Sequence, residues 1–134
     1  MLECETARLA ALTVTQEDVQ NLEHAYAEVA ATMDVPDVEF HRVDARFHMT
    51  IAECSKNRFM KEILSALQDL LVLINVSVPS GREIRQQSCA SSRAIVDAIE
   101  AGDSELARQL MHRHISDTGS NIRRLHRLDD SAQL

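Results

Sequence analysis

Apolar residues recur along this chain at the three- and four-residue spacing of amphipathic helices, with short polar breaks between the helical stretches. The pattern predicts helices over residues 2–12, 16–32, 38–55, 59–78, 83–101 and 104–128. Thr15 and Asp18 form a capping-box pattern before the second helix, and Asp37 is expected to cap the third. Gly102 fits the left-handed position that ends a helix. Since the loops are short, neighbouring helices should pack antiparallel as a bundle.

The composition favours the same all-α class. Hydrophobic residues make up 45% of the 134 residues, which is enough for a real core, while aromatic residues make up only 3%. The chain has three Gly and two Pro, too few for the many turns of an all-β fold. We therefore expect one domain of long helices with a core of aliphatic side chains.

The charge balance argues against a free-standing nucleic-acid-binding protein. The net charge is −7, whereas such proteins usually carry a basic face. The arginines at positions 123, 124 and 127 cluster where cations suit a helix end, so we interpret them as solvated. No segment has the ~20 apolar residues of a membrane span, and the three widely spaced cysteines are expected to be reduced. We therefore expect a cytoplasmic protein that does not contact a membrane.

Helical wheels direct one carboxylate and two imidazoles toward the interior of the bundle. In the third predicted helix, Asp44 and His48 lie one turn apart on the same arc as Phe47. In the last predicted helix, His114 falls within the apolar arc. His112 falls outside that arc and should be exposed to solvent.

Buried charged groups need partners. As ligands of one divalent cation, Asp44, His48 and His114 would satisfy one another, and this donor set suits Zn²⁺ or a related transition metal with open positions. The alternative is that Asp44 and His48 form an i,i+4 hydrogen bond and that His114 is a core histidine. Spacing alone leaves both interpretations open.

Small hydroxyl side chains share the apolar arc of the fifth predicted helix. They are Ser88, Ser91 and Ser92. Hydroxyls leave room in an interior and need hydrogen-bond partners, so they indicate a polar cavity within the bundle. We expect Ser88 and Ser92 to contact a bound ligand. Arg85 lies at the edge of this arc and could pair with a ligand carboxylate, the alternative being a surface arginine.

Three motifs occur in a recognisable order. Residues 44–57 contain D-x-x-F-H-x-x-I-x-x-x-x-x-N, residues 95–103 contain I-x-x-A-I-x-x-G-D, and residues 107–115 contain A-x-x-x-x-x-x-H-I. Together with the helix at residues 2–11, they resemble the FCD domain, the effector-binding domain of the FadR-like subgroup of GntR-family transcription regulators. The resemblance covers nearly the whole chain, so residues 1–134 are expected to form one FCD-like domain.

The resemblance implies an antiparallel bundle of six to seven helices around an internal pocket. Many members of the family hold a metal there through one Asp and up to three His. On the matching positions, the ligands would be Asp44, His48 and His114, and the remaining histidine position is Ser92 in this chain. The resemblance thus implies Zn²⁺ or Ni²⁺ with an incomplete set of side-chain ligands, completed by water or effector.

The resemblance also implies a sensor rather than an enzyme. Effectors of the subgroup are typically small organic acids, and its members act as homodimers. Their DNA contacts come from an N-terminal winged helix-turn-helix domain, for which this chain has no matching segment. DNA binding is therefore expected only through a domain that is not present here.

Other functions stay open at this point. A metal-free sensor of the same family would line its pocket with Ser92 and its neighbours. Two His and one carboxylate also describe the iron site of some oxygenases, although those sites usually lie on β scaffolds. A plain helical dimerisation module would need no ligand at all.

Overall fold

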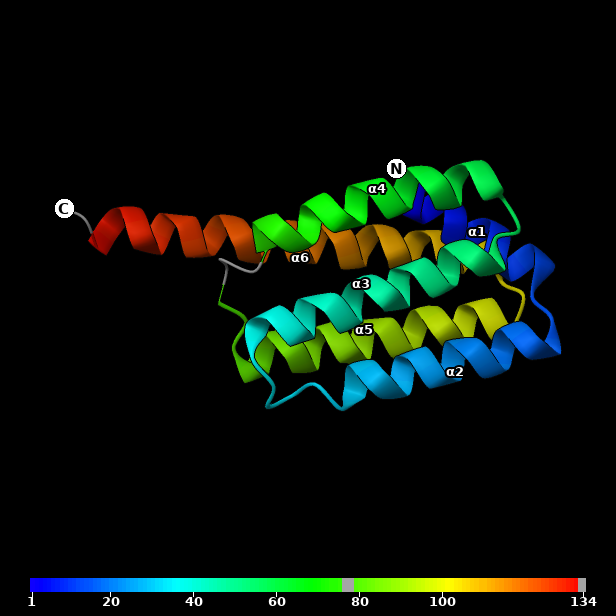
Figure 1. Cartoon of the computed structure of the whole chain (residues 1–134), viewed down its shortest axis with the longest axis horizontal. Coiled ribbons are helices and arrows are strands. Elements are labelled where there is room, and N and C mark those ends of the chain that lie inside the picture. The colour runs from blue at the N-terminus through cyan, green and yellow to red at the C-terminus, as the bar shows by residue number, and fades with distance from the viewer. Residues whose placement is uncertain (76–78, 133–134) are drawn as a thin grey trace.

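The computed structural model describes residues 1–75 and 79–132 (Figure 1). Its elements are α1 (Leu2–Thr13), α2 (Gln16–Ala30), α3 (Asp37–Cys54), α4 (Arg58–Asn75), α5 (Arg82–Glu100) and α6 (Ser104–Ala132). These residues contain no strand, so the predicted all-α class is confirmed. The predicted helices match in order and number, and the last part of the fourth predicted helix, residues 76–78, lies outside the described residues.

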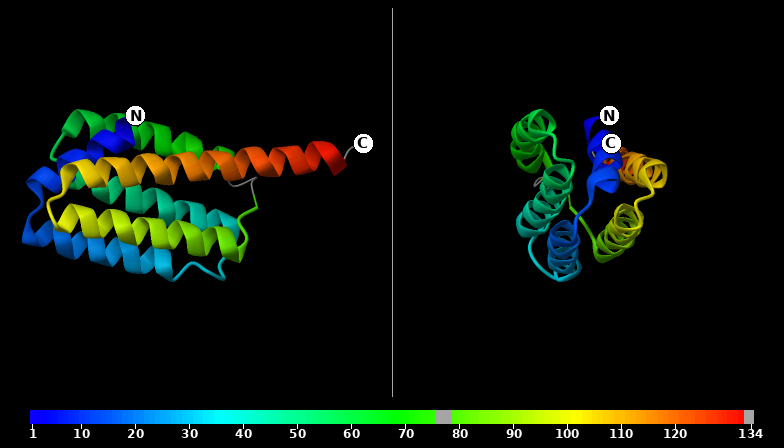
Figure 2. Two further views of the ribbon diagram at one scale, coloured as in Figure 1. Left: turned by 180° about the vertical axis from the view of Figure 1, so that it is seen from behind. Right: turned by 90° about the vertical axis from the view of Figure 1, so that its right-hand side faces the viewer.

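The helices form an antiparallel bundle in which α1 lies between α4 and α6 (Figure 2). Going round the bundle, α4 packs on α3, α3 on α2, α2 on α5 and α5 on α6, while α1 contacts α3, α4, α5 and α6. Among the described residues, the Cα atoms of α3 and α6 do not come within 8 Å of each other. The two helices are therefore held apart, with α1 packed against both.

Small side chains explain how closely α1 packs against its neighbours. Ala7 and Ala10 are fully buried, which lets the neighbouring backbones approach closely. Large aliphatic and aromatic side chains from the surrounding helices complete the core. They include Leu22, Val29, Phe47, Ile51, Ile95, Ile99 and Met111.

Two helix ends follow the predicted local chemistry. The Asp18 amide donates to Thr15 Oγ1 at 3.1 Å, and the Thr15 amide donates to Asp18 Oδ2 at 3.0 Å, which completes the capping box of α2. Gly102 has a φ of 72° after α5, the conformation for which glycine is favoured. Both predictions are confirmed.

The start of α3 differs from the prediction. Pro36 occupies the cap position, and no side chain caps the helix. Asp37 is the first helical residue, and its Oδ1 accepts from Arg85 Nη2 at 2.8 Å and from Ser80 Oγ at 2.9 Å. The carboxylate thus binds the start of α5 instead of its own helix.

Arg85 is a buried structural residue. Its exposed fraction is 4%, so the surface alternative is wrong. Nη1 donates to the backbone oxygens of Thr32 and Val35, each at 2.6 Å, and Nε donates to the Ser80 oxygen at 3.0 Å. The guanidinium therefore ties the α2–α3 connection to the residues that precede α5.

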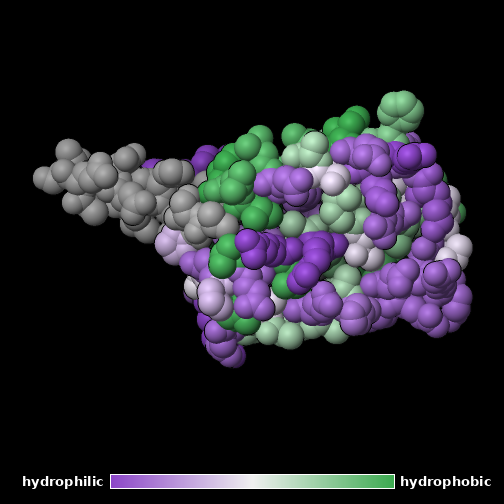
Figure 3. All heavy atoms as spheres, viewed as in Figure 1, coloured by the Kyte–Doolittle hydropathy of each residue, from purple (hydrophilic) through white to green (hydrophobic). Residues whose placement is uncertain are grey.

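Helix α4 is less covered than the others. Leu64 is buried, but Phe59, Ile63, Leu67 and Leu70 are at least 44% exposed. Figure 3 shows hydrophobic side chains gathered along the edge of the molecule that α4 forms. Every helix of the described chain is too short or too polar to cross a lipid bilayer.

Candidate functional site

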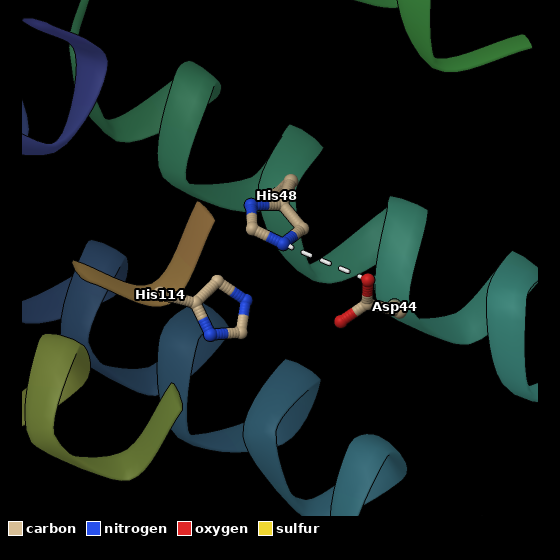
Figure 4. A group of neighbouring side chains, drawn as sticks. All are labelled: Asp44, His48 and His114. Carbon is tan, nitrogen blue, oxygen red and sulfur yellow. Dashed lines mark ion pairs between the residues drawn. The ribbon is translucent and has the colours of Figure 1, made fainter. Parts of the chain in front are cut away.

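Asp44 and His48 on α3 meet His114 from α6 in the interior of the bundle (Figure 4). One ligand atom from each residue lies within 4.8 Å of the other two. The His48 and His114 rings have centroids 5.3 Å apart and are tilted by 30°. The structure therefore brings together the carboxylate and the two imidazoles that the helical wheels directed inward.

Burial sets the charge of this group. His48 and His114 are 6% and 4% exposed, while Asp44 is half-buried. Burial, aided by the nearby His48, lowers the pKa of His114 to about 4, so its ring is neutral at neutral pH. A neutral imidazole has the free lone pair that a metal ligand needs. His112, as predicted, is exposed.

The contact between Asp44 and His48 is not a hydrogen bond. Asp44 Oδ2 and His48 Nε2 are 3.7 Å apart, beyond hydrogen-bond distance. The alternative of an i,i+4 hydrogen bond is therefore wrong for this structure. His114 does have a partner, since its Nδ1 lies 2.9 Å from Ser91 Oγ.

The three residues border an open cavity of about 230 Å³, here called the site cavity. Its lining comes from α1, α3, α4 and α6. The lining residues are Glu3, Asp44, His48, Gln68, Leu71, His114, Ile115, Thr118 and Gly119. With two acidic side chains and no Lys or Arg in this lining, the cavity is electronegative and suits a cation.

Sequence reasoning missed Glu3 and Gln68. Glu3 Oε1 lies 3.2 Å from His48 Nδ1, and Gln68 Nε2 donates to the same oxygen at 2.8 Å. An acidic residue in a first helical turn is already explained by the helix dipole, so nothing in the sequence directed Glu3 to the site. The contacts of Glu3 with His48 and Gln68 become visible only when α1 and α4 are packed beside α3.

An unpartnered polar atom tests whether a metal fits this site. Within the part of the chain that the structure describes, Asp44 Oδ1 is buried without a hydrogen-bond partner. Buried polar atoms nearly always have one. One carboxylate and two imidazoles are a donor set for Zn²⁺ or a similar ion, so the residues present fit the metal that the family implies.

The ligand-contacting residues predicted on α5 do not line the site cavity. Ser92 is fully buried, and its Oγ has no hydrogen-bond partner among the described residues. Ser88 is half-buried, and Arg85 has each of its nitrogens bound to protein oxygens. The cavity opens among α1, α3, α4 and α6, and among the described residues of α5 it is Ser91 that reaches the site, through His114.

Comparison with known proteins agrees with this architecture. The FCD domain matches residues 1–117. A putative L-lactate dehydrogenase operon regulatory protein of Escherichia coli K12 is 29% identical over 130 residues, covering 92% of this chain and 48% of that protein. The HTH-type transcriptional repressor NanR of Cronobacter sakazakii is 28% identical over 116 residues, covering 85% of this chain and 44% of that protein.

A solved structure has the same fold over most of this chain. Streptococcus agalactiae GntR superposes with a TM-score of 0.75 at 25% identity, covering 91% of this chain and 53% of that one. The chain spans about half the length of the curated relatives it matches. The relatives are transcription regulators and not enzymes, as the resemblance implied. Because the family match extends over most of the chain and includes all three site residues, the chain belongs to the FCD domain family.

Proposed function

We propose that residues 1–134 form the effector-binding domain of a GntR-family transcription regulator that senses a small carboxylate through a bound divalent metal. The observation that carries the proposal is the convergence of Asp44, His48 and His114 on one border of the site cavity. The names of the relatives support a role in transcription regulation. In the whole protein, DNA would be bound through an N-terminal winged helix-turn-helix domain, and the protein would act in the cytoplasm.

The proposed metal is Zn²⁺ or Ni²⁺, held by the carboxylate of Asp44 and the imidazoles of His48 and His114. Three protein ligands would leave coordination positions open, and all three residues line the site cavity. When bound, the ion supplies a positive centre that can accept an anionic oxygen. Ser92, at the family's remaining histidine position, is proposed to contribute no direct ligand.

Charge and size define the effector class. The Glu3 and Asp44 carboxylates repel an anion until a cation is present, so a carboxylate effector would require the metal. A cavity of about 230 Å³ holds about seven or eight waters at ~30 Å³ each. That volume suits a compact organic acid. L-lactate is a suitable first probe, because the name of the Escherichia coli relative refers to an L-lactate dehydrogenase operon.

Metal binding is tested first. The purified chain, stripped with EDTA, is titrated with Zn²⁺ and Ni²⁺ in a calorimeter. We expect one site per chain, lost in the His48→Ala and His114→Ala variants. His112→Ala is the matched control, because His112 is exposed and lies on α6, as His114 does. Full metal binding by both site variants would overturn the ligand assignment.

The effector is tested by thermal unfolding. L-lactate and other small organic acids are added to the metal-loaded and metal-free chains. A ligand at about 100 times its Kd stabilises by about 2.7 kcal/mol, which is easily seen as a rise in Tm. We expect the rise only in the metal-loaded chain. An equal rise in both forms would instead favour a metal-free sensor.

A homodimer is the proposed assembly, with α4 at the interface. Phe59, Ile63, Leu67 and Leu70 are exposed and recur every three or four residues, as on a helix that packs against another helix. The stripe carries no charge, so an identical stripe from a second copy is a matching partner. Analytical ultracentrifugation should show dissociation of the Leu67→Glu variant but not of Leu106→Glu, which changes an exposed leucine on α6. A Leu67→Glu variant that stays fully dimeric would exclude α4 from the interface.

A further inference from the structure

Each histidine of the site has one ring nitrogen directed to a side chain on a different helix. Ser91 Oγ from α5 lies 2.9 Å from His114 Nδ1. Glu3 Oε1 from α1 lies 3.2 Å from His48 Nδ1. In both rings the nitrogen beside the outer side chain is Nδ1, and Nε2 is the nitrogen on the side of the site.

For His114, the geometry determines which nitrogen is available. Figure 4 shows one ring nitrogen facing His48 and Asp44 and the other turned away. The nitrogen turned away is Nδ1, which meets Ser91. A metal on Nε2 requires the proton to be on Nδ1, so Nδ1–H then donates to Ser91 Oγ. A serine hydroxyl can accept this bond while it donates its own proton elsewhere.

For His48, the outer partner is a carboxylate. Nε2 faces Asp44 Oδ2 at 3.7 Å, and Nδ1 faces Glu3. The Nδ1 contact is close enough for a hydrogen bond but is not aligned as one, since Nδ1 has no hydrogen-bond partner among the described residues. Gln68 donates to Glu3 Oε1 at 2.8 Å and so anchors the carboxylate from α4.

We propose that Ser91 and Glu3 are positioning residues that fix both site histidines with Nε2 toward the metal. This inference rests on the proposed function, because it assigns outer partners to the proposed metal ligands. A carboxylate or other acceptor behind a ligating imidazole fixes the ring and raises its basicity. Neither residue belongs to the Asp and His ligand set, and they come from α5 and α1.

The test compares outer-partner variants with matched controls. Ser91→Ala and Glu3→Gln are each expected to weaken Zn²⁺ binding by roughly 10- to 100-fold. Ser91→Thr keeps the hydroxyl and should restore affinity to near the wild-type value. Ser88→Ala on the same helix and Glu17→Gln on an exposed surface should leave the affinity unchanged. Circular dichroism and Tm verify that every variant is folded.

A second measurement does not depend on metal. Nitrogen-15 NMR of the metal-free chain reports which ring nitrogen of His114 carries the proton. We expect Nδ1–H in the wild type and a mixture of tautomers in Ser91→Ala. If the wild type takes no metal but shows this tautomer change, the metal proposal fails and the positioning of His114 by Ser91 stands. If metal binds normally and Ser91→Ala alters neither tautomer nor affinity, the positioning role is overturned and the proposed function stands.

Discussion

Arg85 Nη2 donates to Asp37 Oδ1 at 2.8 Å, and this pair joins the first turn of α5 to the first residue of α3. The guanidinium also lies 4.8 Å from the centre of the Phe40 ring, where a cation–π contact is favourable. Nη1 also donates to the backbone oxygens of Thr32 and Val35, so this one side chain holds three separate acceptors. It fixes one end of the bundle without touching the site cavity.

Replacing Arg85 should therefore destabilise the fold. Arg85→Met is expected to lower the free energy of unfolding by about 3 kcal/mol, because a buried arginine leaves unpaired acceptors behind when it is removed. Urea unfolding of the metal-free chain measures the effect. Arg82→Ala is the control, since its pair with Asp34 is exposed and such pairs contribute about 0–1 kcal/mol. Equal losses in the two variants would contradict the structural role of Arg85.

Glu23 on α2 and Glu100 on α5 predict that the free energy of unfolding depends on pH. Arg93 donates to both oxygens of Glu23 at 2.7 Å, and this lowers the pKa of Glu23 to about 2. Burial, together with the nearby Glu23 carboxylate, raises the pKa of Glu100 to about 7. Between the ordinary value of 4.5 and about 7, folded Glu100 keeps a proton that the unfolded chain has released.

The sign of the pH effect follows from this difference. The folded state binds more protons in that window, so the stabilisation present below 4.5 is lost as the pH rises through 7. Glu100→Gln should remove this loss and gain stability relative to the wild type at mildly alkaline pH. Urea unfolding on either side of the window, with exposed Glu62→Gln as control, measures the difference. An unchanged pH dependence in Glu100→Gln would refute the assignment.

Two phenylalanines provide a direct test of the core. Phe47, in the motif on α3, is 0% exposed, while Phe59 on α4 is 81% exposed. Phe47→Ala should lower the free energy of unfolding by about 3–5 kcal/mol, because it leaves a cavity. Phe59→Ala should change it by less than about 0.5 kcal/mol when measured on the monomer. Similar effects at both positions would mean that α4 is packed differently.

Two glycines should respond to alanine with opposite signs. Gly102 has a φ of 72°, so Gly102→Ala should destabilise the fold by about 1 kcal/mol through backbone strain. A Cβ there would meet only the Ala11 oxygen at 3.8 Å, which is ordinary contact. Gly119 lies within α6, and a Cβ there would be 3.8 Å from Arg123 Nη1. Gly119→Ala should therefore stabilise by about 0.5–1 kcal/mol in urea unfolding, because alanine favours the helix.

The features that could be predicted from the sequence are local ones. The capping box of Thr15 and Asp18 depends on residues three apart, and the turn at Gly102 depends on one backbone angle. The opposite environments of His112 and His114 follow from helical periodicity alone. A helical wheel predicts which face of a helix is buried, and this was enough to predict that His112 is exposed and His114 is buried.

The rest depends on which helices become neighbours. A wheel for α5 put Ser88 and Ser92 inside the bundle but could not say that the cavity would open elsewhere. Glu3 reaches His48 only because α1 lies against α3. Asp37 was expected to cap its own helix, and it instead binds Arg85, 48 positions along the chain. Long-range side-chain pairs of this kind leave no periodic trace in the sequence.

Because the backbones of α3 and α6 are apart, the site residues are a direct contact between these two helices. Their side chains meet at His48 and His114, although the Cα atoms of the two helices stay more than 8 Å apart in the described chain. In the proposed metal-bound form, an ion held by Asp44 and His48 on α3 and by His114 on α6 would add a direct link between two helices whose backbones do not touch. The link would lie about one third of the way along α6, whose C-terminal turns extend past the end of the bundle (Figure 1), so metal binding would order the helix at the part that the other helices cover.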